Sequence, residues 1–229
     1  MIQADADPIL LLTRKSSWSD QIIGLARLVF GERLRVMRGE RGSPLPESVY
    51  SERYRAILSA LSMWVVPERL IERAGVAINF HPGSTEYPGI GCYNFALYDG
   101  AREYGVVCHH MLPRVDSGSI IEERRFPVFP QDTVESLKYR SLVVIANLFH
   151  DMICRIACGQ PLPVSAATWK RRPYTRKELN ELGRITPEMP AEEVRRRVRA
   201  MAYPNYPGAF IEVHGVRLEV PGESREPLA

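Results

Sequence analysis

The chain has 229 residues, of which 45% are hydrophobic and 25% charged, the balance of an ordinary globular protein. Its formal net charge of +3 is too small to indicate nucleic acid as a partner. Its four cysteines fit neither a disulfide framework nor a paired metal motif. The early apolar run is too short for a signal peptide and no stretch is long enough for a membrane span, so we expect a cytoplasmic protein.

Strand and helix patterns alternate through the first part of the chain. Apolar runs predict buried strands at residues 9–12, 33–37, 56–66 and 75–78. Helical patterns lie between them at residues 22–29 and 68–74. Strands that alternate with helices form parallel sheets joined by right-handed crossovers. No Gly-x-Gly-x-x-Gly accompanies this pattern, so we expect no dinucleotide cofactor.

The second half of the chain predicts a further pair of strands and a long helix. A short helix and two strand-like runs come first, at residues 94–98, 104–111 and 119–126. Asp132 and Glu135 then have the spacing of a capping box at the start of the long helix. One face of this helix is apolar, which indicates packing on the core: Val134, Leu137, Val144, Leu148 and Met152. Near its end we expect Cys154 and Cys158 to be buried thiols.

The tail differs in composition from the rest of the chain. Residues 169–201 contain more Lys and Arg than Glu. Glutamates stand early and arginines late in a helix that starts near Pro190, the polarity that the helix dipole favours, so we expect a solvated helix end. Residues 210–213 and 216–220 predict a hairpin, whose exposed apolar character would suit a homodimer. We expect residues 221–229 to be frayed.

Three polar residues stand at the ends of two predicted strands, where open α/β sheets bind ligands. Asn79 and His81 follow the apolar run at residues 75–78, and alternation in a strand points both to the same side. Asp116 lies in the turn after residues 104–111. Singly, each residue more often has a structural role. Together they could serve acyl transfer, because an amide donates to an oxyanion, an imidazole moves protons, and a carboxylate orients the imidazole or relays through water.

In order and spacing, residues 78–121 resemble the folate-dependent formyltransferases. The resemblance rests on Asn-Phe-His-Pro at residues 79–82, a loop rich in Pro and Gly, a Gly-Val strand, and Asp-Ser-Gly-Ser-Ile-Ile at residues 116–121. It is close over residues 56–123 and looser elsewhere. It implies an α/β fold with a shortened, Rossmann-like, mostly parallel sheet flanked by helices, and a small C-terminal α/β-hairpin appendage. We therefore expect two parts, a catalytic domain and a helix and hairpin extension, at residues 1–165 and 166–229.

The resemblance also implies a chemistry, with 10-formyltetrahydrofolate as the formyl donor, an amine as the acceptor and no metal ion. Asn79 would donate to the oxyanion that forms when the amine attacks. His81 would assist the oxyanion or carry a proton, and Asp116 would hold the imidazole or a water molecule. The pterin is expected between residues 63–67 and 112–116, where backbone groups would contact its edge. The residues assigned to it are Met63, Val65, Val66, Leu112 and Val115.

Other residues near this site have alternative explanations. His109 and His110 are neighbours in a strand, so at most one can face the site, and a core or surface role is favoured for either. Tyr87 and Tyr93 flank the loop rich in Pro and Gly and are assigned to the acceptor, although aromatic packing explains them equally well.

The first strand-to-helix turn is a candidate anion site. It contains Arg14, Lys15, Ser16 and Ser17, and cations beside a helix N-terminus attract phosphate. We assign Lys15 and Ser16 to the diphosphate of the acceptor, with help from Arg41. A solvated loop with a serine that caps the helix explains these residues at least as well.

The tail indicates which acceptor is used. Residues 199–204 and 207–209 resemble the Arg-Ala…Pro…Pro-x-Ala segment of sugar-nucleotide formyltransferases, which implies a nucleotide-linked amino sugar. The stretch after Met201 is too short for a β-domain that grips tRNA, and residues 13–17 are not the glycine-rich phosphate loop of the purine-pathway enzyme. The alternatives are a methionyl-tRNA or other small-amine formyltransferase, a formyltetrahydrofolate hydrolase, and a non-catalytic binding module.

Overall fold

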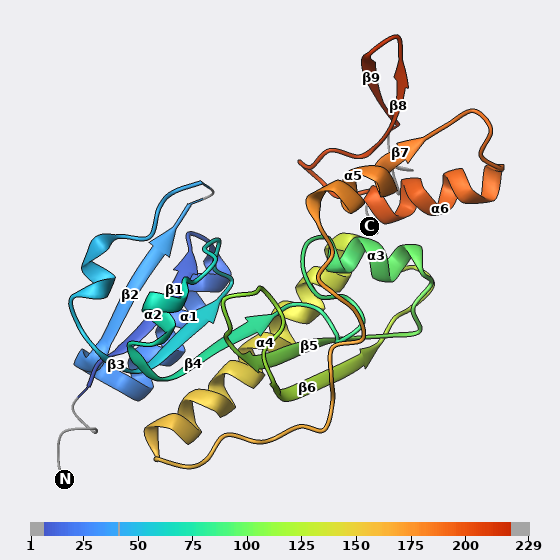
Figure 1. Cartoon of the computed structure of the whole chain (residues 1–229). Coiled ribbons are helices and arrows are strands. Elements are labelled where there is room, and N and C mark those ends of the chain that lie inside the picture. The colour runs from blue at the N-terminus through green and yellow to red at the C-terminus, as the bar shows by residue number, and fades with distance from the viewer. Residues whose placement is uncertain (1–6, 41, 221–229) are drawn as a thin grey trace.

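A computed structural model describes residues 7–40 and 42–220. Its centre is a six-stranded sheet with the strand order β2-β1-β3-β4-β5-β6 (Figure 1). The strands are β1 (Ile9–Arg14), β2 (Leu34–Gly39), β3 (Tyr54–Ala60), β4 (Ala74–His81), β5 (Glu103–His110) and β6 (Ile120–Pro127). Strands β1 to β4 run parallel, and β5 and β6 are antiparallel to their neighbours. The predicted Rossmann-like, mostly parallel sheet is therefore confirmed.

Both faces of this sheet are covered. The helices are α1 (Ser17–Phe30), α2 (Glu68–Ile71), α3 (Cys92–Tyr98), α4 (Val134–Ala157), α5 (Arg176–Gly183) and α6 (Ala191–Met201), with 3-10 turns η1 (Gly31–Arg33) and η2 (Glu47–Tyr50). Ile9 and Leu11 of β1 belong to the core under α1 and α4. Leu10 and Leu12 belong to the core under α2 and η2. This alternation buries all four side chains completely, as expected for a parallel strand enclosed on both sides.

Strand β3 ends earlier than the sequence predicts. The apolar run at residues 56–66 predicts one strand, but β3 ends at Ala60. Leu61 has a φ of 57°, a left-handed conformation that an extended strand cannot continue through. The side chains of Met63 and Val65 are exposed rather than packed in the core. The second half of this run is therefore a loop at the end of the sheet, and its apolar character has another cause, described below.

Helix α4 is capped one residue later than predicted. Thr133 is the N-cap, and Thr133 and Ser136 form the capping box in place of Asp132 and Glu135. The buried Asp132 carboxylate is used elsewhere, because it pairs with Arg140 at 2.6 Å. The apolar face of α4 packs on the core as predicted.

The expectation of buried thiols near the end of α4 is wrong. Cys158 is exposed, because α4 ends at Ala157 and Cys158 lies beyond its last turn. Cys154 is half-buried, and its Sγ lies 3.6 Å from Nε2 of the exposed His150 ring. The buried thiols of the described chain are those of Cys92 and Cys108.

The C-terminal part packs beside α3, at one end of the main sheet (Figure 1). It contains α5, α6 and a second sheet of β7 (Arg184–Ile185), β8 (Ala209–Val213) and β9 (Val216–Val220), in that order. The predicted hairpin is confirmed as the antiparallel pair β8–β9. Leu179, Leu182 and Met201 share one hydrophobic core with Phe95 of α3. Residues 221–229, expected to be frayed, lie outside the described residues.

The arginines at the end of α6 are not simply solvated. Arg197 pairs with Glu193 at 2.6 Å and donates to three backbone carbonyls at the end of α5. Arg199 donates to the backbone carbonyl of Asp132 at 3.1 Å. These contacts tie α6 to α5 and to the start of α4, so the prediction of a solvated helix end is wrong for the half-buried Arg197, whereas Arg199 is exposed as predicted.

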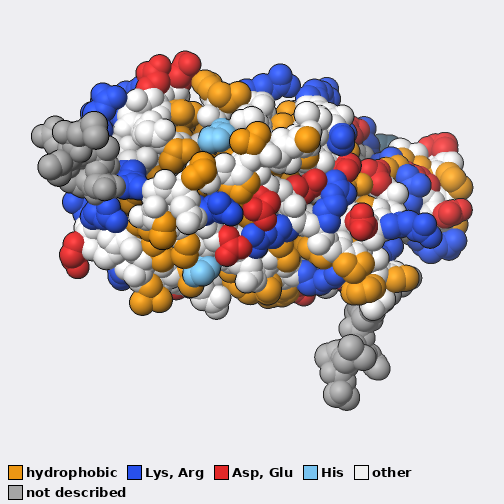
Figure 2. All heavy atoms as spheres, turned by 90° about the horizontal axis from the view of Figure 1, so that it is seen from below, with side chains coloured by type: hydrophobic (Ala, Val, Ile, Leu, Met, Phe, Trp, Pro, Cys, Tyr) orange, Lys and Arg blue, Asp and Glu red, His pale blue; other side chains and the backbone are white. Residues whose placement is uncertain are grey.

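The charged side chains on the face shown in Figure 2 are of both signs and intermingled. Several arginines of the described chain pair with carboxylates, among them Arg124 with Asp151 at 2.5 Å and Arg125 with Glu86 at 2.7 Å. This face therefore presents no continuous basic patch of the kind that binds a polyanion. Among the described residues, no helix is both long and apolar enough to cross a membrane.

Candidate active site

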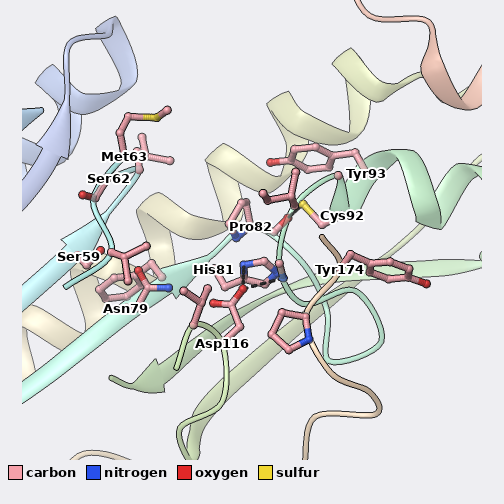
Figure 3. A pocket seen from close by; sticks show the side chains of 18 of the residues that line it. Ser59, Ser62, Met63, Asn79, His81, Pro82, Cys92, Tyr93, Asp116 and Tyr174 are labelled. Carbon is pink, nitrogen blue, oxygen red and sulfur yellow. Dashed lines mark hydrogen bonds and ion pairs between the residues drawn. The ribbon is translucent and has the colours of Figure 1, made fainter. Parts of the chain in front are cut away.

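A cavity of about 810 Å³ opens where the parallel strands end (Figure 3). Its wall comes from the ends of β1, β3 and β4, the segments at residues 61–66 and 111–116, the start of α3, the first turns of α4, and the segment at residues 173–176. Open α/β sheets bind their ligands at such strand ends, and the volume suits a ligand of cofactor size.

Asn79 and His81 leave β4 on the same side, as predicted, and both line the cavity (Figure 3). Asn79 is paired with His109 across β4 and β5, and its Nδ2 lies 3.1 Å from His109 Nε2. Nδ1 of His109 donates to the His110 carbonyl at 2.8 Å, so Nε2 accepts from the amide when the ring is neutral. One N–H of Asn79 is used in this way, which leaves the other for a ligand oxygen.

Two contacts orient the buried imidazole of His81. Its Nε2 donates to the Tyr87 carbonyl at 2.9 Å, and its Nδ1 lies 3.2 Å from Asp116 Oδ2. The carbonyl keeps the hydrogen on Nε2, so Nδ1 is the nitrogen that takes up and releases a proton. Gly83 permits this close approach, because a Cβ there would lie 2.5 Å from His81 Nε2.

Asp116 is a buried carboxylate between two imidazoles. Besides His81, its Oδ1 lies 3.3 Å from His109 Nε2, and its Oδ2 accepts from the Gly89 N–H at 2.7 Å. Burial raises the pKa of Asp116, but the nearby His81, the contact with His109 and the hydrogen bond from the Gly89 N–H outweigh burial and lower the pKa to about 2. The group is therefore ionised at neutral pH and stabilises a protonated His81.

The turn that presents Asp116 is unusual in its backbone. Asp116 itself has a φ of 43°, a conformation that Asp tolerates better than most residues. Two residues later, a Cβ at Gly118 would lie 1.8 Å from the His110 carbonyl oxygen. The Asp-Ser-Gly sequence thus allows the loop to fold tightly against the end of β5.

Sequence reasoning favoured a core or surface role for His109, and the structure corrects this. His109 is buried, lines the cavity and contacts both Asn79 and Asp116. The register of β4 on β5 places His109 rather than His110 opposite Asn79. Alternation within β5 predicts only that one of the two histidines faces the site, and pairing selects which one.

Two aromatic residues of the tail complete the site, and sequence reasoning did not identify either. The Trp169 ring stands edge-on to His81 and His109, with ring centroids 5.8 Å and 5.2 Å away, and its Nε1 donates to the Gly118 carbonyl at 2.9 Å. Tyr174 lines the cavity and stacks on Phe95 with centroids 3.6 Å apart. The one signal in the sequence that could have indicated them is that both aromatic residues stand in a basic stretch that has neither a helical nor a strand pattern.

The residues assigned to the pterin all belong to the lining of the cavity. All five line it: Met63, Val65, Val66, Leu112 and Val115. Val66 is buried, whereas the other four side chains are between 42% and 64% exposed. Exposed apolar side chains that gather around a cavity indicate an apolar ligand surface. This explains why the run at residues 56–66 is apolar beyond the end of β3, and contact with a pterin stays a prediction.

The structure separates the residues assigned to the acceptor. Tyr93 lines the cavity, but the Tyr87 ring is buried, and its backbone carbonyl is what contacts His81. Ser16 caps α1 by accepting from the Ser19 N–H, so the structural explanation of this serine holds. Lys15 is exposed and pairs with Glu40 at 2.6 Å.

Neither Lys15 nor Ser16 lines the cavity, whereas their neighbour Arg14 does. Arg41 lies outside the described residues. The contact of Lys15, Ser16 and Arg41 with a diphosphate therefore stays a prediction.

This arrangement can donate to an oxyanion and transfer a proton, but it offers no strong nucleophile. Cys92 lines the cavity, and burial raises the pKa of its thiol to about 11, so it is neutral at physiological pH. No group of three or more His, Cys, Asp and Glu in the described chain is arranged to hold a metal ion. The chemistry that fits is direct attack by a bound nucleophile on a bound acyl group, assisted by Asn79 and His81.

The sequence of residues 26–153 matches the model of a family described as formyl transferase. Because this match covers more than half of the chain, the chain belongs to the formyl transferase family.

Solved structures share the fold over nearly the whole chain. A candidate sugar N-formyltransferase of Mycobacterium tuberculosis, Rv3404c, has a TM-score of 0.75 and 21% identity, covering 96% of this chain and 100% of that one. A sugar N-formyltransferase from Shewanella sp. has a TM-score of 0.76 and 16% identity, covering 96% and 99%. An N-formyltransferase from Helicobacter canadensis, solved with folinic acid and dTDP-3-aminofucose, has a TM-score of 0.72 and 16% identity, covering 91% and 85%. At these identities the likeness establishes the fold.

Proposed function

We propose that the protein transfers the formyl group of 10-formyltetrahydrofolate to the amine of a nucleotide-linked amino sugar. The observation that carries this proposal is the contact network of Asn79, His81 and Asp116 in one cavity, in a member of the formyl transferase family. The donor and acceptor classes are supported by the Helicobacter canadensis protein, which was solved with a formylated folate and a nucleotide-linked amino sugar. The tail segment at residues 199–209 supports the same acceptor.

The first chemical step is attack of the neutral amine on the formyl carbon. A carbon–nitrogen bond forms and the carbonyl oxygen becomes an oxyanion. The free N–H of Asn79 donates to this oxygen, because the other N–H is held by His109. One such donor typically contributes about 10²–10³-fold in rate.

Collapse of the intermediate requires a proton to move. The amine nitrogen must lose one proton, and N10 of the folate must gain one as its bond to the formyl carbon breaks. Nδ1 of His81 accepts and returns this proton, and ionised Asp116 stabilises the imidazolium form between the two events. A positioned acid-base group contributes about 10²–10⁴-fold in rate. The products are the formamide and tetrahydrofolate.

The experiment that tests this function is turnover by the purified protein with 10-formyltetrahydrofolate and a panel of nucleotide-linked amino sugars. We expect a product whose mass is that of the acceptor plus one formyl group less one hydrogen, together with loss of the free amine. Formate release at the same rate without any amine would instead identify a hydrolase. Formylation of methionyl-tRNA alone would identify the tRNA reaction, and folate binding without turnover would identify a binding module.

A further inference from the structure

The cavity is strongly asymmetric in charge. Among the described residues that line it, Asp116 is the one carboxylate, and it is already matched by His81 and His109. The cationic side chains in the same lining are Arg14, Lys138, Arg114 and Arg176. A cavity with unmatched positive charge concentrates anionic ligands.

Arg14 stands out among these cations. It ends β1 and lines the cavity, and its Nε is buried with no hydrogen-bond partner among the described residues. Buried polar groups are nearly always satisfied, so an unsatisfied guanidinium nitrogen at a cavity indicates an acceptor that a ligand supplies. Its neighbours differ, because Lys15 pairs with Glu40 and Arg38 of β2 pairs with Asp20 at 2.7 Å.

Lys138 is the second cation on the same side of the site. It lies on α4, lines the cavity and donates to the Tyr203 hydroxyl, which is a neutral group. Tyr93 lines the same cavity. Burial raises the pKa of Tyr93 well above its usual value, the charge of Arg14 opposes this rise, and the Tyr203 phenol adds to it. Arg14 and Lys138 thus line the same cavity, Arg14 from the end of β1 and Lys138 from α4.

An aromatic surface lies beside Lys138. Tyr203 and Tyr206 are stacked with ring centroids 4.7 Å apart, and both line the cavity. Tyr206 is 57% exposed, so a ring face remains for a planar ligand. Two cations and an open aromatic face in one cavity suit a nucleoside diphosphate, which carries both phosphates and a planar base, better than an isolated carboxylate.

We propose that Arg14 and Lys138 bind the diphosphate of the acceptor, and that Arg14, rather than Lys15, is the anion-binding residue of the first strand-to-helix turn. This inference rests on the proposed function, since it locates the nucleotide of the nucleotide-linked amino sugar. Folate also carries carboxylates on its glutamate, and an arginine could bind those instead, so the test must distinguish the two ligands.

Binding can be measured without turnover by isothermal titration calorimetry. The probes are thymidine diphosphate and uridine diphosphate for the acceptor, and 5-formyltetrahydrofolate for the donor. We expect Arg14→Gln and Lys138→Gln each to weaken binding of the preferred nucleoside diphosphate by about tenfold to a hundredfold, the loss of a charge-assisted hydrogen bond. Arg14→Lys, which keeps the charge but loses Nε, should have an intermediate affinity.

Binding of 5-formyltetrahydrofolate should stay within about twofold of wild type in these variants, which also shows that they are folded. The matched control is Arg38→Gln, the same change on the neighbouring strand in a residue that pairs with Asp20 outside the cavity. It should leave both affinities unchanged. Lys15→Gln is the direct comparison within the turn.

Several results would overturn the inference. Weaker folate binding by Arg14→Gln, with unchanged nucleotide binding, would assign Arg14 to the folate carboxylates. Unchanged binding of both ligands would leave Arg14 without a ligand, and a loss confined to Lys15→Gln would move the diphosphate to the exposed part of the turn. If the wild-type protein formylates nucleotide-linked sugars and Arg14→Gln does so equally well, this inference is rejected and the proposed function stands. If the wild-type protein binds neither nucleoside diphosphate, the nucleotide in the proposed function is rejected as well.

Discussion

Replacing Asp116 with Asn should change both the stability of the protein and its turnover. The pKa of Asp116 is lowered from 3.8 to about 2 in the folded chain. A folded-state pKa below the unfolded value means that ionisation favours the folded state, so the stabilisation is present above the unfolded pKa and is lost as the pH falls through the folded one. A difference of about 1.8 pKa units corresponds to about 2.5 kcal/mol in the free energy of unfolding.

This magnitude can be measured by chemical unfolding between pH 6 and pH 2. Other carboxylates titrate in the same range, so the quantity to follow is the difference between wild type and Asp116→Asn. We expect this difference to fall by about 2 kcal/mol between pH 6 and pH 2, with about half of that fall already reached at pH 3 and the remainder of the stabilisation lost below pH 2. The amide can still accept from the Gly89 N–H, so the variant should fold at neutral pH.

Turnover of the same variant should fall by about a hundredfold or more, because the imidazolium form of His81 loses its counter-charge. Asp151→Asn is the matched control, since Asp151 also has a lowered pKa but lies at the surface and pairs with Arg124. It should leave turnover unchanged. A wild-type rate in Asp116→Asn, or a difference in unfolding free energy that does not vary with pH, would refute the role assigned to this carboxylate.

Three further predictions concern single side chains. Asn79→Ala and His81→Ala should each lower kcat by about 10²–10³-fold or more, and folded variants with normal turnover would reject the catalytic assignment; His81→Ala should also lower the melting temperature, because the buried Asp116 loses its main partner. Trp169→Phe keeps a ring but loses the donor to the Gly118 carbonyl, so we expect a loss of about 1–2 kcal/mol in the free energy of unfolding by urea titration; no loss would show that water replaces the indole. Leu218, 54% exposed on β9, tests the predicted homodimer, because Leu218→Glu should shift the mass measured by light scattering from dimer to monomer, and a monomeric wild type would contradict the dimer itself.

The central part of the fold follows from local sequence patterns. The apolar runs at residues 9–12 and 75–78 predict strands of a parallel sheet that is covered on both faces, and β1 and β4 form there. Asn79 and His81 share a face because alternation is a property of one strand, which needs no knowledge of its partners. Asp116 could be placed by its position after the next strand, although the left-handed backbone that aims it is visible only in the structure.

What could not be predicted depends on pairing between segments that are distant in the sequence. His109 faces the site because β5 pairs with β4 in a particular register, and a shift of one residue would present His110 instead. Arg14 and Lys15 are adjacent cations that the sequence does not distinguish. Only Arg14, the last residue of β1, lines the cavity, whereas Lys15 follows the strand and pairs with Glu40. The capping box at α4 was misplaced for a more local reason, since the Asp132 carboxylate is engaged by Arg140, a residue further along the same helix.

The tail shows how a distant segment can position a catalytic group that it does not contact. After α4 the chain returns past β6 toward α5 (Figure 1). On the way the Tyr174 N–H donates to the Pro88 carbonyl and the Tyr174 carbonyl accepts from Ile90. Between them, Gly89 donates its N–H to Asp116, and a Cβ at Gly89 would lie 2.5 Å from the Tyr174 carbonyl oxygen. The tail therefore fixes the loop that fixes the carboxylate, and the change in composition near residue 165 does not mark a boundary of the site.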